Sequence, residues 1–330
     1  MPPKQGVAGE FFCEFESCQV RLKMKILKKD KEGITIIPEN LNDLWFLYNR
    51  IDNSEIEQKT LRTKSISRGG EIVKGKKVPQ MVAIKIEKKK WERNKIRVTG
   101  KIVSETDKNK YHSLNLEIDK KLVIFTENHF FKLKDLPKEE NYEILICLID
   151  KKLADLRIYK FGKFKEIKKI NSKGRENEFY KEVANILKKE KGKILLAGPG
   201  NTKDKVAKLL DKEIVIDNLS SCGEKGFKEL LKRGSIRKII EKLRDEQEEK
   251  TVKKFLVEIK KNQNKVCYGS AVETQIERIK EILVLSSLVP KYEKILFEAE
   301  KNGTKINIVD DEKEYCREMR VFEIVGICWY

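Results

Sequence analysis

The chain has 330 residues, with 72 lysine and arginine residues against 53 aspartate and glutamate residues, a net charge of +19. This length exceeds what one hydrophobic core usually serves, so two or three domains are expected, and no apolar run approaches the roughly 20 residues of a membrane span. The first 23 residues lack the basic head and apolar core of a secretory signal, and the seven scattered cysteines suit reduced thiols, so we expect a cytoplasmic protein.

The positive charge is unevenly distributed along the chain. Residues 24–137 hold 26 basic and 16 acidic side chains, residues 138–262 hold 33 and 22, and residues 263–330 hold 10 and 12. Many dispersed lysines and arginines bind phosphate backbones through counterion release. The first two parts are therefore expected to face a polyanion, and we favour nucleic acid over a lysine-rich surface that is merely solvated.

Residues 1–23 show no clear periodicity and are followed by a second methionine, Met24. We expect a disordered leader or an over-extended start, with the native chain beginning at Met24. From there the pattern predicts two strands and a short helix over residues 41–51. Alternating segments then predict a small β-barrel that ends near residue 137; these segments are 59–66, 80–87, 95–103, 113–118 and 122–125.

A glycine- and cation-rich segment, residues 68–77, separates two of these predicted strands. Its composition predicts a flexible, positive loop that can enter a groove. Two further cations precede it. The candidate RNA-binding residues are Arg62, Lys64, Arg68, Lys74, Lys76 and Lys77.

Strands alternate with helices through residues 138–262, which predicts an α/β domain. A hairpin over 142–161 comes first. A helix over 176–189 and a buried strand over 193–197 follow, and a long charged helix over 235–262 ends the domain. Residues 263–330 are predicted to form a compact αβα domain, with helices over 270–279 and 291–301. In the middle domain, Thr202 is a candidate helix N-cap after a glycine-rich turn.

Signals for catalysis are weak. The two histidines, His112 and His129, both fall in the predicted barrel. The segment 198–203 lacks the Gly-Lys-Ser/Thr ending of a nucleotide-binding loop, so a tight strand-to-helix turn is favoured. An acidic run at 310–312 lacks further ligands at metal-binding spacing, and we interpret it as a solvated loop. We expect no catalytic residue, no metal site and no required cofactor.

Five stretches in order and spacing resemble the Pelota family, relatives of the eukaryotic and archaeal peptide-chain release factor that act in ribosome rescue. They are MKILKKDKEGITIIPENLNDLWFLYN (24–49), LLAGPGNTKD (195–204), SSCGEKGFKELLKRGSI (220–236), KVCYGSAVE (265–273) and ILVLSSL (282–288). The resemblance implies an Sm-like β-barrel at 24–137, a release-factor-type α/β domain at 138–262 and a domain similar to ribosomal protein L30e at 263–330.

The release factor hydrolyses peptidyl-tRNA with a Gly-Gly-Gln motif, which residues 138–262 lack. The single Gly-Gly pair, Gly69-Gly70, is followed by Glu71. Peptide release is therefore not expected. This chain has a basic segment where the release factor has its catalytic loop. The resemblance implies that the cations of this segment contact a GTPase and tRNA-binding surfaces. These cations are Lys168, Lys169, Lys173 and Arg175.

By resemblance, the chain is expected to enter the empty A site of stalled ribosomes as a monomer. Its expected partners are the ribosome, a translational GTPase related to elongation factor 1α and an ABC-type ATPase that splits the subunits. Two alternatives remain open. One is an endoribonuclease that uses a divalent metal ion in the barrel, in which case that ion would be its cofactor. The other is a general RNA-binding adaptor.

Overall fold

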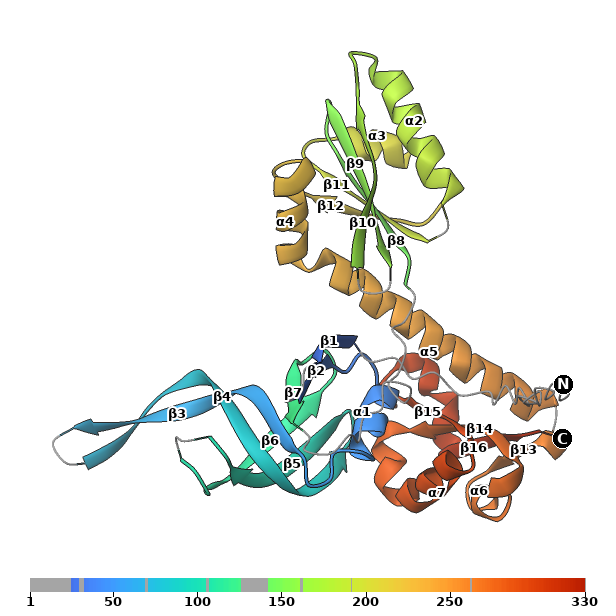
Figure 1. Cartoon of the computed structure of the whole chain (residues 1–330). Helices are drawn as coiled ribbons and strands as arrows, with labels where there is room; N and C mark the ends of the chain where they lie inside the picture. Colours follow the sequence, from blue (N-terminus) through green and yellow to red (C-terminus); the bar gives the residue numbers. More distant parts are fainter. Residues whose placement is uncertain are drawn as a thin grey trace, which may run out of the picture.

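The computed structural model describes residues 25–29, 33–68, 71–104, 107–125, 142–160, 163–190, 192–261 and 263–329. Three sheets follow one another along the chain, with seven, five and four strands (Figure 1). We call the parts built around them the N-terminal, central and C-terminal units. The predicted multidomain fold of mixed helices and strands is confirmed.

The N-terminal unit is an antiparallel sheet with the strand order β1-β2-β7-β3-β4-β5-β6. Buried and exposed positions alternate along β5, so one face of each strand packs on a core. Helix α1 (Leu41–Tyr48) begins at Asn40, whose side chain accepts a hydrogen bond from the Asp43 backbone N–H at 2.8 Å. The strands are β1 (Lys25–Lys29), β2 (Gly33–Ile37), β3 (Glu55–Arg68), β4 (Glu71–Glu92), β5 (Lys95–Ile102), β6 (Tyr111–Glu117) and β7 (Leu122–Phe125).

Strands β3 and β4 continue beyond the sheet as a long hairpin that projects from the unit (Figure 1). The prediction of a flexible loop over residues 68–77 is wrong, because residues 71–77 belong to β4 and pair with β3. Hydrogen bonding along the ladder overrides the loop-like composition of this segment. We call residues 59–68 and 71–81 the arm.

The central unit has the strand order β10-β9-β8-β11-β12, with helices on both faces. Every residue of β8 is buried, because α2 and α3 cover one face while α4 and the start of α5 cover the other. The elements are β8 (Ile144–Ile149), β9 (Leu153–Lys160), β10 (Lys163–Asn171), α2 (Glu176–Lys189), β11 (Lys193–Gly198), α3 (Thr202–Ala207), β12 (Ile214–Asn218), α4 (Gly223–Arg233) and α5 (Ser235–Lys261). Thr202 is the first residue of α3 and the N-cap is Asn201, so the predicted cap is off by one residue.

The C-terminal unit has the strand order β13-β16-β14-β15. The end of α5 packs on one face and α7 on the other, which is the predicted αβα arrangement. The prediction of a helix over 270–279 is wrong, because α6 is a single turn and β14 begins at Ile279. The elements are β13 (Val266–Tyr268), α6 (Ala271–Thr274), β14 (Ile279–Leu285), α7 (Val289–Lys301), β15 (Lys305–Val309) and β16 (Ile324–Cys328).

The N-terminal and C-terminal units share one hydrophobic core. Buried residues of α1, including Leu44 and Trp45, belong to the same cluster as Leu296 of α7 and Ile308 of β15. By contrast, the cores of the central unit are separate clusters. Helix α5 runs from the central unit to the C-terminal unit (Figure 1). Among the described helices, none combines the length and the apolar character that crossing a bilayer requires.

Candidate nucleic-acid interface and domain junction

The arm carries the predicted RNA-binding residues away from the body of the N-terminal unit. From Lys59 opposite Met81 to Arg68 opposite Glu71, the strands pair with each other, whereas the neighbouring strands β7 and β5 pair only with the base of the hairpin. Nine residue steps of strand rise about 30 Å. The arm is therefore a ribbon that can reach into a channel too narrow for a domain.

The predicted residues lie on both strands of the arm. The Lys77 side chain is exposed, and the side chains of residues 62–76 lie outside the described part of the structure. At the base of the arm, Leu61 is 62% exposed and Met81 is 46% exposed. The β3 residues are Arg62, Lys64 and Arg68, and the β4 residues are Lys74, Lys76 and Lys77.

The second predicted set lies on the central unit. Lys168 and Lys169 are on β10, an edge strand whose side chains are nearly all exposed. Lys173 is in the following turn with a φ of 43°, and Arg175 precedes α2. The structure thus brings all four cations to one end of the unit, but their contact with a GTPase stays a prediction.

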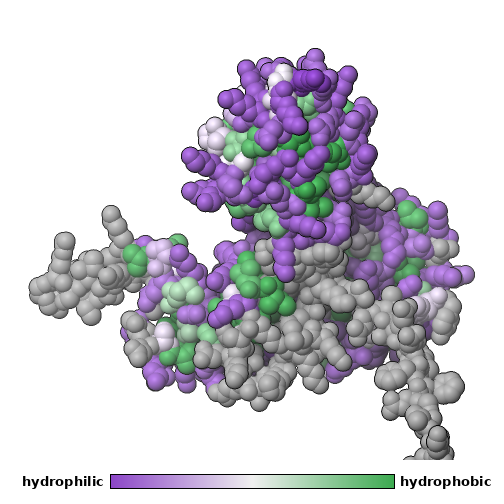
Figure 2. Space-filling view, turned by 45° about the horizontal axis from the view of Figure 1, so that its top comes forward, coloured by the Kyte–Doolittle hydropathy of each residue, from purple (hydrophilic) through white to green (hydrophobic). Residues whose placement is uncertain are grey.

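Three of these four cations already have acidic neighbours. Lys168 lies 2.8 Å from Glu182, and Lys169 lies 2.7 Å from Glu166. The hydrogen bond to Glu166 raises the pKa of Lys169. Arg175 pairs with Glu178 at 3.3 Å. Exposed pairs of this kind contribute little to stability, so the lysines can exchange these partners for a protein or phosphate ligand. On the face seen in Figure 2, hydrophilic residues cover most of the central unit.

The weaker chemical candidates have structural roles. The buried Lys203 ammonium donates a hydrogen bond to the Gly200 carbonyl oxygen. The backbone of the turn after β11 therefore supplies a hydrogen-bond acceptor for this cation. In the acidic run, Asp310 accepts from the Glu312 backbone N–H and Asp311 accepts from that of Ser287. Within the described ranges, no three histidine, cysteine or acidic side chains are grouped so that they could hold a metal ion. His129 lies outside those ranges, and His112 is on β6.

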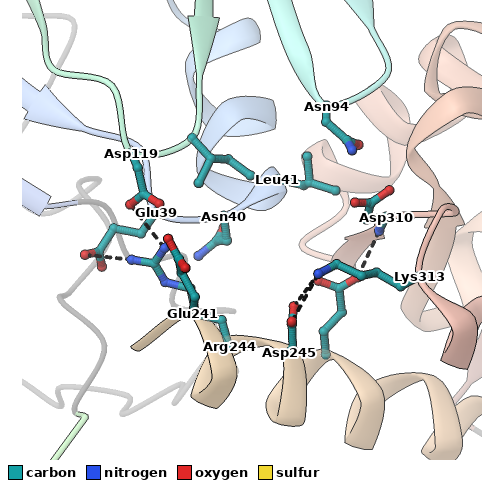
Figure 3. A pocket seen from close by; sticks show the side chains of 12 residues that line it. Glu39, Asn40, Leu41, Asn94, Asp119, Glu241, Arg244, Asp245, Asp310 and Lys313 are labelled. Carbon is teal, nitrogen blue, oxygen red and sulfur yellow. Dashed lines mark hydrogen bonds and ion pairs between the residues drawn. The ribbon is translucent and has the colours of Figure 1, made fainter. Parts of the chain in front are cut away.

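A polar cavity of about 290 Å³ lies where all three units meet (Figure 3). Arg244 of α5 reaches toward the N-terminal unit, with its guanidinium 3.2 Å from Glu39 and 3.2 Å from Asp119. About two helical turns earlier, Arg237 lies 3.2 Å from the same Asp119. These ion pairs fasten the middle of α5 to the N-terminal unit, and we call them the arginine clamp.

The opposite wall of the cavity joins α5 to the C-terminal unit. Lys313 lies 2.9 Å from Asp245, and Glu248 accepts a hydrogen bond from the Asp310 backbone N–H at 2.8 Å. Burial raises the pKa of Glu248 to about 7, and the nearby Asp310 and Asp245 carboxylates add to this effect. The junction therefore holds a carboxyl group that changes its charge near neutral pH.

The junction was not predicted from the sequence. Its members come from segments that are far apart in the chain, and each reads as an ordinary surface charge in isolation. The one signal is the concentration of five acidic and two basic residues over 241–249, on a helix that joins two predicted domains. A long charged helix with that composition is equally typical of a fully solvated helix.

Comparisons with known proteins find relatives that match most of the chain. A family model described as "Pelota N-terminal domain" matches residues 20–137. A protein pelota homolog of Archaeoglobus fulgidus is 30% identical over 318 residues, which cover 87% of this chain and 92% of that protein. A protein pelota homolog of Methanocaldococcus jannaschii is 26% identical and covers 90% and 96%, respectively.

The crystal structure of Archaeoglobus fulgidus Pelota is similar over nearly the whole chain. It has a TM-score of 0.75 and 26% identity, and the match covers 93% of this chain and 99% of that one. That structure is described as revealing inter-domain structural plasticity. A model of ribosome-bound archaeal Pelota with ABCE1 matches with a TM-score of 0.53 and 24% identity over 93% of this chain and 99% of that one, and shares the fold.

Proposed function

The chain belongs to the Pelota family, and we propose that it is a ribosome-rescue factor in the cytoplasm. In this proposal the N-terminal unit occupies the decoding region of an empty A site. A translational GTPase related to elongation factor 1α delivers the protein against the central unit. Subunit dissociation follows without peptide release, and the chain itself performs no reaction and requires no cofactor.

The arm is the observation that carries this proposal. A ribbon about 30 Å long with seven lysines and arginines in its sequence suits a narrow channel lined by phosphates. Lysine and arginine contacts to phosphate carry no sequence information. A factor that must act on any stalled message needs contacts of this kind, because the codon in the A site differs from case to case.

The central unit supports the absence of peptide release. Its sequence has no Gly-Gly-Gln motif, and the strand-to-helix segment after β10 is basic instead. Peptidyl-tRNA hydrolysis by a release factor of this type would need that motif. Cations on an edge strand are suited to an acidic protein surface or to RNA, which agrees with docking of a GTPase at Lys168–Arg175.

An ABC-type ATPase is the proposed partner for subunit splitting. The archaeal Pelota of similar fold is described as ribosome-bound together with ABCE1. We propose the corresponding contact for this chain through the C-terminal unit, which has a net charge of −2 over residues 263–330. Its charge makes protein contact more suitable than RNA contact for this unit.

The arm can be tested by reversing its charge. Replacing Lys74, Lys76 and Lys77 by glutamate is expected to impair dissociation of stalled ribosomes while binding of the GTPase stays unchanged. A matched control replaces three exposed lysines of α4, Lys225, Lys228 and Lys232, by glutamate. Equal loss with both triple variants would contradict a specific role of the arm.

The nuclease alternative is tested in the same preparations. Incubation with Mn²⁺ and a structured RNA is expected to leave the RNA intact. Cleavage that disappears on replacing a single carboxylate of the N-terminal unit would establish an enzyme and overturn the proposal of a factor without a reaction.

A further inference from the structure

The outer face of β4, β5 and β6 gathers cations that the arm does not include. Lys85 is opposite Lys101, and Lys101 is opposite Tyr111 on the next strand. Two rows further along the strands, Lys90 is opposite Arg97. Lys88 lies between these rows. We call this set the lysine face: Lys85, Lys88, Lys90, Arg97, Lys101 and Tyr111.

The alternation of the strands produces this face. Ile84, Ile86, Ile96 and Val98 point into the core and are buried, so their neighbours must point outward. A register shift between Ile86 and Lys88 inserts one extra residue, Glu87. Because of this bulge, three lysines of β4 lie on the outer face rather than alternating away from it.

Lys89 shows how a lysine of the same strand behaves when it has a structural role. Its side chain is 18% exposed and lies 2.5 Å from Asp52, and its ammonium also donates to the Tyr48 carbonyl oxygen. The members of the lysine face are all exposed instead. Within residues 85–90, 97–101 and 111–115, the single carboxylate is Glu87, which lies 3.6 Å from Lys101. On the neighbouring strand β3, Glu55 is opposite Lys85 and lies beside the face. With five cations against these two carboxylates, the face has a surplus of three cations.

Tyr111 adds an aromatic surface to these cations. Its side chain is 63% exposed, although a tyrosine usually buries much of its ring. The Lys101 ammonium lies 5.8 Å from the centre of the ring. An exposed ring beside lysines is the combination that binds unpaired bases by stacking while the cations hold the backbone.

We propose that the lysine face is a second RNA-contact surface, which binds a phosphate backbone across β4–β6 and stacks an unpaired base on Tyr111. This inference rests on the proposed function, because it extends RNA contact from the arm to the side of the same unit. Its occupant is RNA rather than an acidic protein, since the exposed aromatic ring next to lysines matches a base. Together the arm and the face would hold the N-terminal unit on RNA from two directions.

The test uses the full chain and a short fluorescein-labelled oligouridylate, with affinity measured over a range of salt concentrations. Replacing Lys88, Lys90 and Arg97 by glutamate is expected to weaken binding by at least about tenfold at low salt. It is also expected to reduce the slope of log K against log salt by about 2, because each lost phosphate contact removes about 0.7. The α4 triple variant, K225E with K228E and K232E, is the charge-matched control and is expected to bind nearly as the wild type does.

Tyr111 is tested separately, because stacking is not a charge effect. Tyr111→Ala is expected to weaken binding about 5- to 150-fold without changing the salt slope, and Tyr111→Phe is expected to retain most of the affinity. A thermal unfolding curve like that of the wild type establishes that each variant has an intact fold. Equal loss with the α4 control, or no loss with either face variant, would overturn the inference.

A parallel measurement with vacant ribosomes separates this inference from the proposed function. If the wild type binds ribosomes and the face variants bind oligouridylate as the wild type does, the lysine face is wrong and the rescue role stands. If the wild type fails to bind ribosomes but the triple lysine-face variant and Tyr111→Ala bind oligouridylate more weakly than the wild type does, the rescue role is wrong and the inference about the lysine face is supported. Weakened ribosome binding with unchanged oligouridylate binding would point to a protein occupant and would also overturn the inference.

Discussion

The indole nitrogen of Trp91 donates a hydrogen bond to the backbone carbonyl oxygen of Ser286 at 3.0 Å. This bond joins β4 of the N-terminal unit to the 3-10 turn that follows β14 in the C-terminal unit, and it is buried. The Ser286 hydroxyl in turn donates to the Arg93 carbonyl oxygen at 2.5 Å. The two units therefore hold each other through reciprocal bonds within a continuous core.

Trp91→Phe is expected to destabilise the protein by about 1–3 kcal/mol, because the Ser286 carbonyl oxygen loses its buried donor. Chemical denaturation followed by circular dichroism measures the change. Since the two units share a core, they are expected to unfold in one transition in the wild type and the variant. Separate transitions of the N-terminal and C-terminal units in the wild type would contradict the shared core, whereas a separate transition of the central unit, whose cores are distinct clusters, would not.

Arg244→Ala is expected to let the central unit move more freely relative to the N-terminal unit, because it removes two ion pairs of the arginine clamp. The side chain is only 14% exposed, so the loss leaves Glu39 and Asp119 partly buried without that cation, at a cost of about 1–3 kcal/mol. The distribution of distances between fluorophores on the N-terminal and central units is expected to broaden. Lys253→Ala, on the exposed side of the same helix, should leave the distribution of distances unchanged. An equally broad distribution in this variant would contradict a specific role of the arginine clamp.

Glu248→Gln is expected to stabilise the protein more at pH 8 than at pH 5.5. The pKa of Glu248 in the folded state is about 7, above its value of about 4.3 in an unfolded chain. The folded state therefore binds more protons between these values, and stability from this group falls as pH rises through them. The amide oxygen of glutamine can still accept from the Asp310 N–H. Thermal unfolding at both pH values tests this, and a pH-independent difference would show that Glu248 does not titrate there.

Local patterns predicted most elements well. The helix over 176–189 has apolar residues at helical spacing and matches α2 residue for residue, and the helix predicted from 235 ends within one residue of α5. The buried strand predicted over 193–197 from its continuous apolar run is β11, which ends one residue later. In the two helices the apolar spacing, and in the strand the continuous apolar run, agree with the tertiary contacts that each element makes.

The arm was missed because its composition and its structure disagree. Gly69, Gly70 and Gly75 with many cations are typical of a loop, yet the strands on either side keep pairing to Arg68 and Glu71. The lysine face was missed for a different reason. A bulge at Glu87 moves lysines to one side of β4, and a bulge depends on the partner strand, which a sequence pattern does not contain.

The junction could not be predicted because it depends on how the units are placed. Arg244 is 125 residues from Asp119 in the chain and more than 200 from Glu39, and nothing near any of them marks the others. Contacts between units are set by the shape of two finished surfaces. Sequence patterns describe each surface only one element at a time.

Sedimentation with ribosomes tests the central claim, that this chain is a rescue factor without a reaction of its own. Wild-type protein is expected to sediment with stalled ribosomes that have an empty A site, and to do so more strongly with its GTPase and a non-hydrolysable GTP analogue. It is expected to leave actively translating ribosomes largely unbound. Failure to sediment with stalled ribosomes at low salt, with the GTPase and the splitting ATPase present, would contradict the account.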